Sequence, residues 1–208
     1  MRQPTDAALD LYWIPLGAGG HSVRFNGRVF EALAAARDHR GRDDLYHAAL
    51  IAQLDGVRHT IELAPSPDAD LRARGVVATG PVGSRLLGRW RVFRYEVRCW
   101  PGGRIPDLAC AVGGARRVAT ERSVAQRVLG LVSLAPVPVW GRDELHAGEM
   151  WNSNSMISWV LATAGVVTTA LGPPRHGRAP GWNAGLVVAR RSDHASAQAT
   201  PWSAAPAP

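Results

Sequence analysis

The segment LYHAALIAQLDGVRHTIELAP, residues 45–65, constrains the fold more than any other part of the sequence. Two apolar runs flank the pair Asp55-Gly56. Both residues of an Asp-Gly pair accept positive φ, so the pair predicts a tight β-hairpin turn. The segment HSVRFNGRVF, residues 21–30, follows the same plan around Asn-Gly and leads into an Ala-rich run with helical character. Two such hairpins predict an antiparallel sheet.

Further strands precede the helices in the chain. DLYWIPL, residues 10–16, reads as a strand, and RWRVFRYEVRCW, residues 89–100, alternates clearly enough to predict one long strand. The apolar run LVVA, residues 186–189, predicts a closing strand near the C-terminus. Strands first, then helices, then a closing strand predict the α+β class, with an antiparallel sheet of hairpins packed against a few helices.

Two helices are predicted from residue spacing and caps. TERSVAQRVLGLVSLAP, residues 120–136, has helical spacing, with Thr120 or Ser123 as a possible N-cap. A second helix covers residues 154–165 and stops at Gly165, a natural residue after a helix end. The predicted organisation is a loose N-terminus at 1–6, a single α+β domain at 7–191 and a disordered Ala/Ser/Pro-rich tail at 192–208.

The net charge of +7 does not by itself indicate nucleic-acid binding. All 24 basic residues are arginine, a bias typical of GC-rich genomes, and most of them are scattered along the chain. The basic and aromatic stretch at 89–98 is better explained as a strand with one solvated face. We therefore predict no nucleic-acid partner.

Metal sites, cofactors and membrane spans are not predicted either. Cys99 and Cys110 lack the spacing of a metal motif. The irregular loop PVPVWGRDELHAGE, residues 136–149, is of a kind that often borders a site. Its three acids lie near His146 but match no metal template, and a solvated loop explains them better. Neither an apolar run of about 18 residues nor a signal-peptide pattern occurs, so we predict a cytoplasmic protein.

The stretch EMWNSNSMISWVL, residues 149–161, carries more polar residues at a helix start than capping requires. Asn152, Ser153 or Asn154 can cap the helix by accepting a hydrogen bond from a backbone N–H. A helix N-terminus also stabilises an anionic nucleophile or an oxyanion. A serine needs a positioned base to use this, and His47 is the candidate.

These residues resemble the permuted papain-like superfamily of NlpC/P60 and lecithin-retinol-acyltransferase-like proteins. In that superfamily a His strand precedes a Cys at the N-terminus of a helix, and Ser153 occupies the Cys position here. The chain is also similar to an uncharacterised bacterial family with a His-x-Trp-Ile-Ala strand, an Arg-Tyr-Glu-Val strand and a Pro-Asn-Ser-Asn-Thr-Phe helix start. The corresponding motifs are His47-Ala-Ala-Leu, Arg94-Tyr95-Glu96-Val97 and Trp151-Asn152-Ser153-Asn154-Ser155-Met156, in the same order.

The resemblance implies a permuted papain-like cleft, which leaves three hypotheses open. An enzyme would be a hydrolase or acyltransferase with Ser153 as nucleophile and His47 as base, and Glu96 or Glu62 would orient the imidazole. A vestigial cleft would do neither chemistry nor binding. In the preferred hypothesis the protein is non-catalytic and binds a small molecule, peptide, glycan or lipid-like ligand. Its contacts would come from Asn152, Asn154, Ser155, Trp151 and Trp182.

Overall fold

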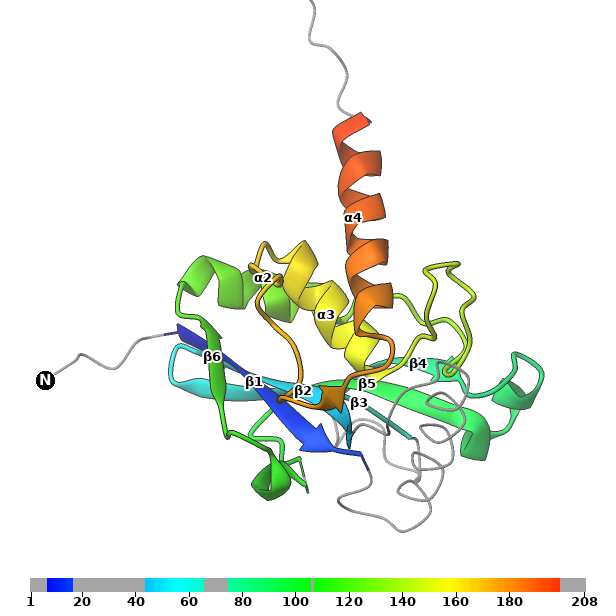
Figure 1. The fold of residues 1–208 in the computed structure, drawn as a ribbon, viewed down its shortest axis with the longest axis horizontal. Helices are drawn as coiled ribbons and strands as arrows, with labels where there is room; N and C mark the ends of the chain where they lie inside the picture. Colours follow the sequence, from blue (N-terminus) through cyan, green and yellow to red (C-terminus); the bar gives the residue numbers. More distant parts are fainter. Residues whose placement is uncertain (1–6, 17–43, 66–74, 106, 199–208) are drawn as a thin grey trace, which may run out of the picture.

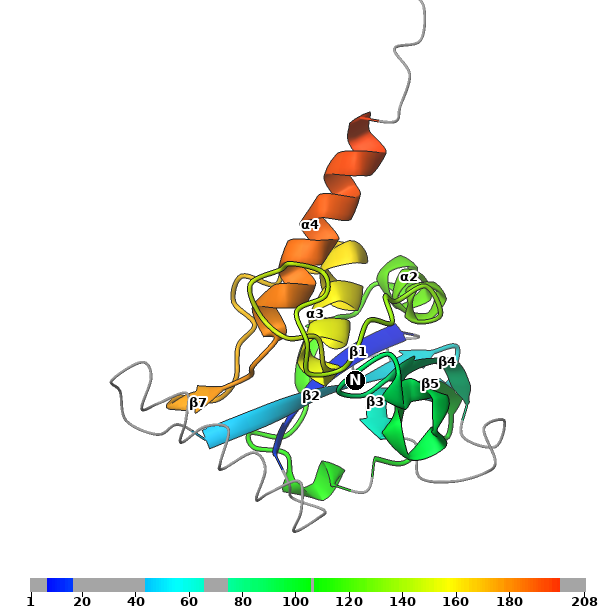
Figure 2. The same cartoon turned by 90° about the vertical axis from the view of Figure 1, so that its right-hand side faces the viewer.

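The computed structural model describes residues 7–16, 44–65, 75–105 and 107–198. Its antiparallel sheet has the strand order β4-β5-β3-β2-β1-β6, and the short β7 pairs in parallel with β2. The α-helices of the described residues lie on one face of this sheet (Figures 1 and 2). The predicted α+β class with an antiparallel sheet is confirmed.

The strands are β1 (Ala7–Pro15), β2 (Asp44–Leu54), β3 (Val57–Pro65), β4 (Val76–Pro81), β5 (Arg94–Pro101), β6 (Arg116–Ala119) and β7 (Gly177–Arg178). The helices are α2 (Arg122–Val132), α3 (Ser153–Thr163) and α4 (Trp182–Gln198), with 3-10 turns η2 (Leu87–Arg89), η3 (Arg91–Phe93) and η4 (Leu108–Cys110).

The β2–β3 hairpin forms around the predicted Asp-Gly turn. Asp55 and Gly56 have φ of 51° and 77°, the pair of positive values that a two-residue hairpin turn of this type needs. Antiparallel pairing continues from the turn to Leu50 and Ile61. Arg122 at the start of α2 forms an ion pair with Asp55 and so connects the turn to the helical layer. This hairpin prediction is confirmed.

The alternation of side chains gives β2 one face toward the helices and one away from them. Tyr46, Ala48, Leu50 and Ala52 belong to the main hydrophobic core, whereas Ala49 belongs to a smaller cluster on the other face. Successive side chains of a strand point to opposite faces, so odd-numbered β2 residues face away from the helices. The helices supply the other side of the main core through Ala125, Val128, Val132, Met156, Ile157, Val160 and Leu161.

The ends of α3 agree with the sequence, and the start of α2 does not. Asn152, one of the three predicted candidates, is the N-cap of α3, and Gly165 after the helix has φ of 83°. The N-cap of α2 is Glu121 in place of Thr120 or Ser123. Backbone hydrogen bonds to the Glu121 carbonyl start α2, and no side chain caps it.

The long strand predicted for residues 89–100 begins five residues later. The chain first makes the turns η2 and η3, and β5 starts only at Arg94. Backbone N–H groups bond the carbonyl three residues earlier and close both turns. The alternating pattern is typical of a strand, but residues 89–93 form 3-10 turns instead. The prediction of a strand with one solvated face is therefore wrong for its first five residues.

The closing strand predicted at 186–189 is part of α4. This helix packs against α3 and continues to Gln198, so residues 192–198 of the predicted disordered tail are also helical. A four-residue apolar run does not distinguish a strand from a segment of buried helix. The predictions for 1–6, 21–30 and 199–208 lie outside the described residues. Among the helices of the described ranges, none is long and apolar enough to cross a membrane.

Candidate functional site

The N-terminus of α3 lies where β2 and β3 separate. β3 pairs with β2 as far as Leu50 and Ile61 and then continues along β5. Past this point the β2 backbone groups that face β3 need another partner. Asn154 is that partner, because its Oδ1 accepts from the Ala48 N–H at 2.7 Å and its Nδ2 donates to the Tyr46 carbonyl at 3.0 Å. One side-chain amide thus continues the ladder in place of a strand.

The other polar residues of this helix start are also bonded within the chain. Asn152 Oδ1 accepts from the Ser155 N–H, and Ser155 Oγ accepts from the Asn152 N–H at 3.1 Å, which forms a capping box. Asn152 and Asn154 both donate to the Pro180 carbonyl, at 2.8 and 2.9 Å. A ligand could use these hydrogen bonds only by breaking them. The three residues therefore cap α3 and brace it against the chain around Pro180, and their contact with a ligand stays a prediction.

The two tryptophans predicted to bind a ligand are core residues. Trp151 and Trp182 are both buried in the main core. The ring of Trp182 packs on that of Trp13 in β1, with centroids 5.0 Å apart, so it connects α4 to the sheet. Both rings fill space between layers and offer little surface to a ligand.

The sheet separates Ser153 from His47. Ser153 is the first residue of α3 and is buried on the helix side. His47 pairs with Ile14 of β1, and it alternates with Ala48, so its side chain shares the face of Ala49. The alternation of side chains along β2 decides on which face the His47 imidazole lies, since a shift of the strand by one residue would move it to the helix side. The predicted nucleophile and base therefore lie on opposite faces, and the structure does not assemble the predicted pair.

Glu62 and Glu96 share the face of the sheet on which His47 lies. They alternate with main-core residues of β3 and β5, and both bind Arg98, at 3.0 and 2.9 Å. Burial raises the pKa of Glu62, and the Arg98 hydrogen bond opposes that rise. The negative charge of Asp107 raises the pKa of both Glu62 and His47. Three of the four predicted catalytic residues thus share one polar face, without the serine.

The partly buried imidazole of His47 predicts a loss of stability in acid. Burial lowers the pKa of His47, and the charge of Asp107 only partly offsets this. Between the lowered folded pKa and the ordinary value of about 6.5, the unfolded chain binds more protons, so stability falls as the pH drops through that window. His47→Gln should remove this part of the pH dependence of the unfolding free energy, measured by urea titration. A His47→Gln variant with the same pH profile as the wild-type protein would contradict the prediction.

A cavity of about 460 Å³ lies between the turn after β4 and the irregular loop at 136–149. The loop thus lines a cavity, and that it borders a functional site stays a prediction. The cavity is open to solvent and is walled mainly by charged and polar groups. Its lining residues are Gly83, Ser84, Arg85, Val139, Arg142, Asp143 and Glu144.

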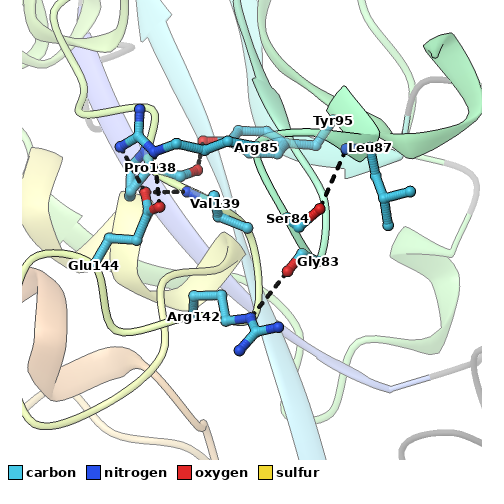
Figure 3. A network of polar contacts seen from close by, with 9 residues as sticks. All are labelled: Gly83, Ser84, Arg85, Leu87, Tyr95, Pro138, Val139, Arg142 and Glu144. Atoms are coloured by element: carbon cyan, nitrogen blue, oxygen red, sulfur yellow. Dashed lines mark hydrogen bonds and ion pairs between the residues drawn. The ribbon is translucent and has the colours of Figure 1, made fainter. Parts of the chain in front are cut away.

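Hydrogen bonds fix the two segments that form the cavity. A parallel bridge joins Trp140 to the residue after β4. The Tyr95 hydroxyl donates to the Pro138 carbonyl at 2.8 Å, and Arg142 Nε donates to the Gly83 carbonyl at 2.9 Å (Figure 3). These bonds run from β5 and the β4 turn to the loop, so the walls of the cavity are held in place before any ligand binds.

The two acids in the cavity already have hydrogen-bond donors. Glu144 accepts two bonds from Arg85 and one from the Val139 N–H, each at 2.9 Å. The Arg85 bonds, followed by the Val139 bond, hold the pKa of Glu144 below its ordinary value, so this carboxylate is ionised at neutral pH. Asp143 accepts from two backbone N–H groups later in its own loop, at 2.7 and 2.9 Å. Both carboxylates are therefore engaged within the chain, Glu144 with three bonds and Asp143 with two.

Arg142 brings unused donors to the same cavity. A guanidinium carries five N–H bonds in a planar fork, and within the described part of the chain Arg142 donates through Nε alone, to Gly83. Its terminal nitrogens keep four N–H groups for a ligand. A planar fork of this kind suits a carboxylate or a phosphate, which can accept two parallel bonds.

No protein-family model, curated protein or solved structure matches the chain. The resemblance to papain-like proteins therefore rests on the sequence motifs and stays a prediction. Among the residues that the structure describes, no group of three or more His, Cys, Asp and Glu side chains could hold a metal ion.

The charged residues of the cavity do not form a recognisable sequence motif. Arg85 and its partner Glu144 are 59 positions apart, and Arg142 shares no motif with Arg85. The available signal was the irregular loop itself, whose turns include the positive-φ residues Gly141 and Gly148. Sequence reasoning points to that loop but not to its partner segment after β4.

Proposed function

We propose that this chain is a non-catalytic binding protein that takes a small anionic ligand, a carboxylate or a phosphate, in the cavity beside Arg142. The observation that carries the proposal is the mismatch between donors and acceptors in the cavity. Glu144 and Asp143 are already bonded within the chain, whereas Arg142 has spare N–H groups at the cavity wall. An anion with two oxygens complements that surplus.

A binding role is favoured over catalysis by the placement of the predicted catalytic residues. Ser153 and His47 lie on opposite faces of the sheet, and a serine without a positioned base is a weak nucleophile. The cavity itself contains Ser84, but its hydroxyl accepts a hydrogen bond from the Leu87 N–H at 3.2 Å (Figure 3). Ser84 therefore serves the adjoining turn and supports the shape of the cavity.

Arg142→Gln should weaken anion binding at least about tenfold, because a hydrogen bond to a charged group contributes about 1.5–3 kcal/mol. The probes are inorganic phosphate and citrate, titrated by calorimetry or by the amide resonances of the loop. The matched control is Arg104→Gln, an exposed arginine just beyond the opposite end of β5, which removes the same charge. Equal weakening in both variants would show that only the net charge of the protein matters. Absence of anion binding by the wild-type protein would contradict the proposal.

A further inference from the structure

Residues 85–94, RLLGRWRVFR, form a turn between β4 and β5 that exposes five apolar side chains. We refer to this segment as the 85–94 turn. Single exposed apolar residues are ordinary on protein surfaces, but several large ones together mark a binding surface. The exposed fractions are 76% for Val92, 69% for Leu86, 59% for Trp90, 38% for Phe93 and 36% for Leu87.

The turn holds these side chains outward on a fixed backbone. Gly88 is buried against Pro81, so closely that a Cβ on Gly88 would lie 2.5 Å from the Pro81 Cβ. Arg94 donates to the Gly88 carbonyl at 3.0 Å, and Arg85 pairs with Glu144. Figure 3 shows Leu87 on the far side of the Gly83–Ser84 turn from Glu144. The exposure of the apolar groups is therefore a built feature of the turn.

The turn contains basic residues and no acid, and of its arginines Arg85 is paired with Glu144 outside the turn. Its ten residues include four arginines. Arg89 and Arg91 are exposed among the apolar side chains, and the chain as a whole carries a net charge of +7. A partner for this surface must accept aliphatic and aromatic groups and present negative charge around them.

We propose that the 85–94 turn docks the protein on an anionic lipid bilayer. Leu86, Trp90 and Val92 would enter the boundary between headgroups and acyl chains, where tryptophan is favoured. Arg89 would bond lipid phosphates and respond to the negative surface potential. This association is peripheral, and it does not depend on the ligand proposed for the cavity.

The same residues fit other partners less well. Nucleic acid rewards arginine and aromatic stacking, but the two most exposed groups, Val92 and Leu86, are aliphatic and do not stack. A second copy of the chain, joined through the same surface about a two-fold axis, would bring Arg89 and Arg91 of both copies together. Hydrocarbon beneath an anionic headgroup layer accepts both the aliphatic groups and the charge.

The test is co-sedimentation of the full chain with phosphatidylcholine vesicles that contain or lack phosphatidylserine. The wild-type protein should bind the anionic vesicles and lose that binding at high salt. The triple variant Leu86→Ser, Trp90→Ser, Val92→Ser should bind at least about tenfold less, since affinity scales with buried apolar area. Arg89→Gln should lower the partition coefficient about fivefold, the amount expected for one basic residue near the surface.

The chain offers closely matched controls at a distance in sequence. Val167 is exposed to the same 76% as Val92, and Leu134 to the same 69% as Leu86. The double variant Leu134→Ser, Val167→Ser should sediment as wild type does, and Arg104→Gln should lose much less than Arg89→Gln. Urea unfolding of each variant checks that the fold is retained, since substitutions at such exposed positions change stability little.

Three results would overturn the proposal. The first is equal vesicle binding by the triple variant and its control. The second is binding of the wild-type protein to a DNA duplex but not to anionic vesicles, with loss in the Arg89→Gln variant. The third is a dimer in analytical ultracentrifugation that the triple variant abolishes, together with no sedimentation with lipid.

Discussion

Replacing Asn154 with alanine should lower the free energy of unfolding by about 3 kcal/mol, because two buried backbone groups of β2 lose their partner and the Pro180 carbonyl loses one of its two donors. Asn154 binds the Ala48 N–H, the Tyr46 carbonyl and the Pro180 carbonyl at once. The first two belong to β2 where β3 no longer pairs with it, and no other strand of the described ranges takes the place of β3 there. A buried N–H without an acceptor costs the full desolvation of that group. Urea titration monitored by circular dichroism measures the loss.

Two further variants separate the hydrogen bonds from the side-chain volume. Asn183→Ala makes the same chemical change at an exposed residue whose Nδ2 bonds Glu149 at 3.1 Å, and it should cost less than about 1 kcal/mol. Asn154→Asp keeps the volume and the acceptor for Ala48 but loses both donors, so it should destabilise the fold by an amount comparable to Asn154→Ala. An Asn154→Ala variant as stable as Asn183→Ala would show that the fork between β2 and β3 closes without this amide.

The local signals in the sequence predict the sheet well where a turn has a stereochemical requirement. Asp55-Gly56 needs two positive φ values, and few residue pairs other than Asn-Gly or Asp-Gly meet that need. The flanking alternation then sets which β2 residues face inward. Gly165 at the end of α3 and Asn152 at its start are predictable for the same reason, since each satisfies a local backbone need.

The sequence misleads where an apolar run lacks such a requirement. Residues 89–93 alternate like a strand, but their outward groups meet solvent and the backbone closes two 3-10 turns. Residues 186–189 are apolar like a strand, but they continue the α4 helix that packs on α3. In both segments the outcome depends on neighbours distant in sequence, which periodicity does not reveal.

The candidate site shows the same limit at the level of single residues. The motifs of His47 and Ser153 follow one another in the order of the family that they resemble. Whether the two side chains come close in space depends on which face of β2 the helix α3 packs against. Asn154 settles this by binding Tyr46 and Ala48, 108 and 106 positions away. The helix then covers the face of the even-numbered residues, and His47 is odd. A one-residue difference in register would have brought the imidazole to the helix side.

Replacing Gly185 with alanine should destabilise the protein by at least about 3 kcal/mol, because α4 approaches α3 too closely for a methyl group. A Cβ at Gly185 would lie 2.0 Å from the Ser155 carbonyl oxygen and 2.1 Å from Ser158 Oγ. Ser158 Oγ has little freedom to yield, since it already donates to the Trp182 carbonyl at 2.7 Å. Backbone atoms on both helices would have to separate, which would also disturb the capping box and the packing of Trp182.

The control for this variant should change stability in the opposite direction. Gly130 lies within α2, and a Cβ there would meet no heavy atom within 4 Å. Gly130→Ala should therefore raise the free energy of unfolding by about 0.5–1 kcal/mol, the usual gain of alanine over glycine inside a helix. Equal and favourable effects at both positions would mean that α3 and α4 are not in close contact at Gly185. Opposite signs for one chemical change would locate the constraint in the contact between α3 and α4.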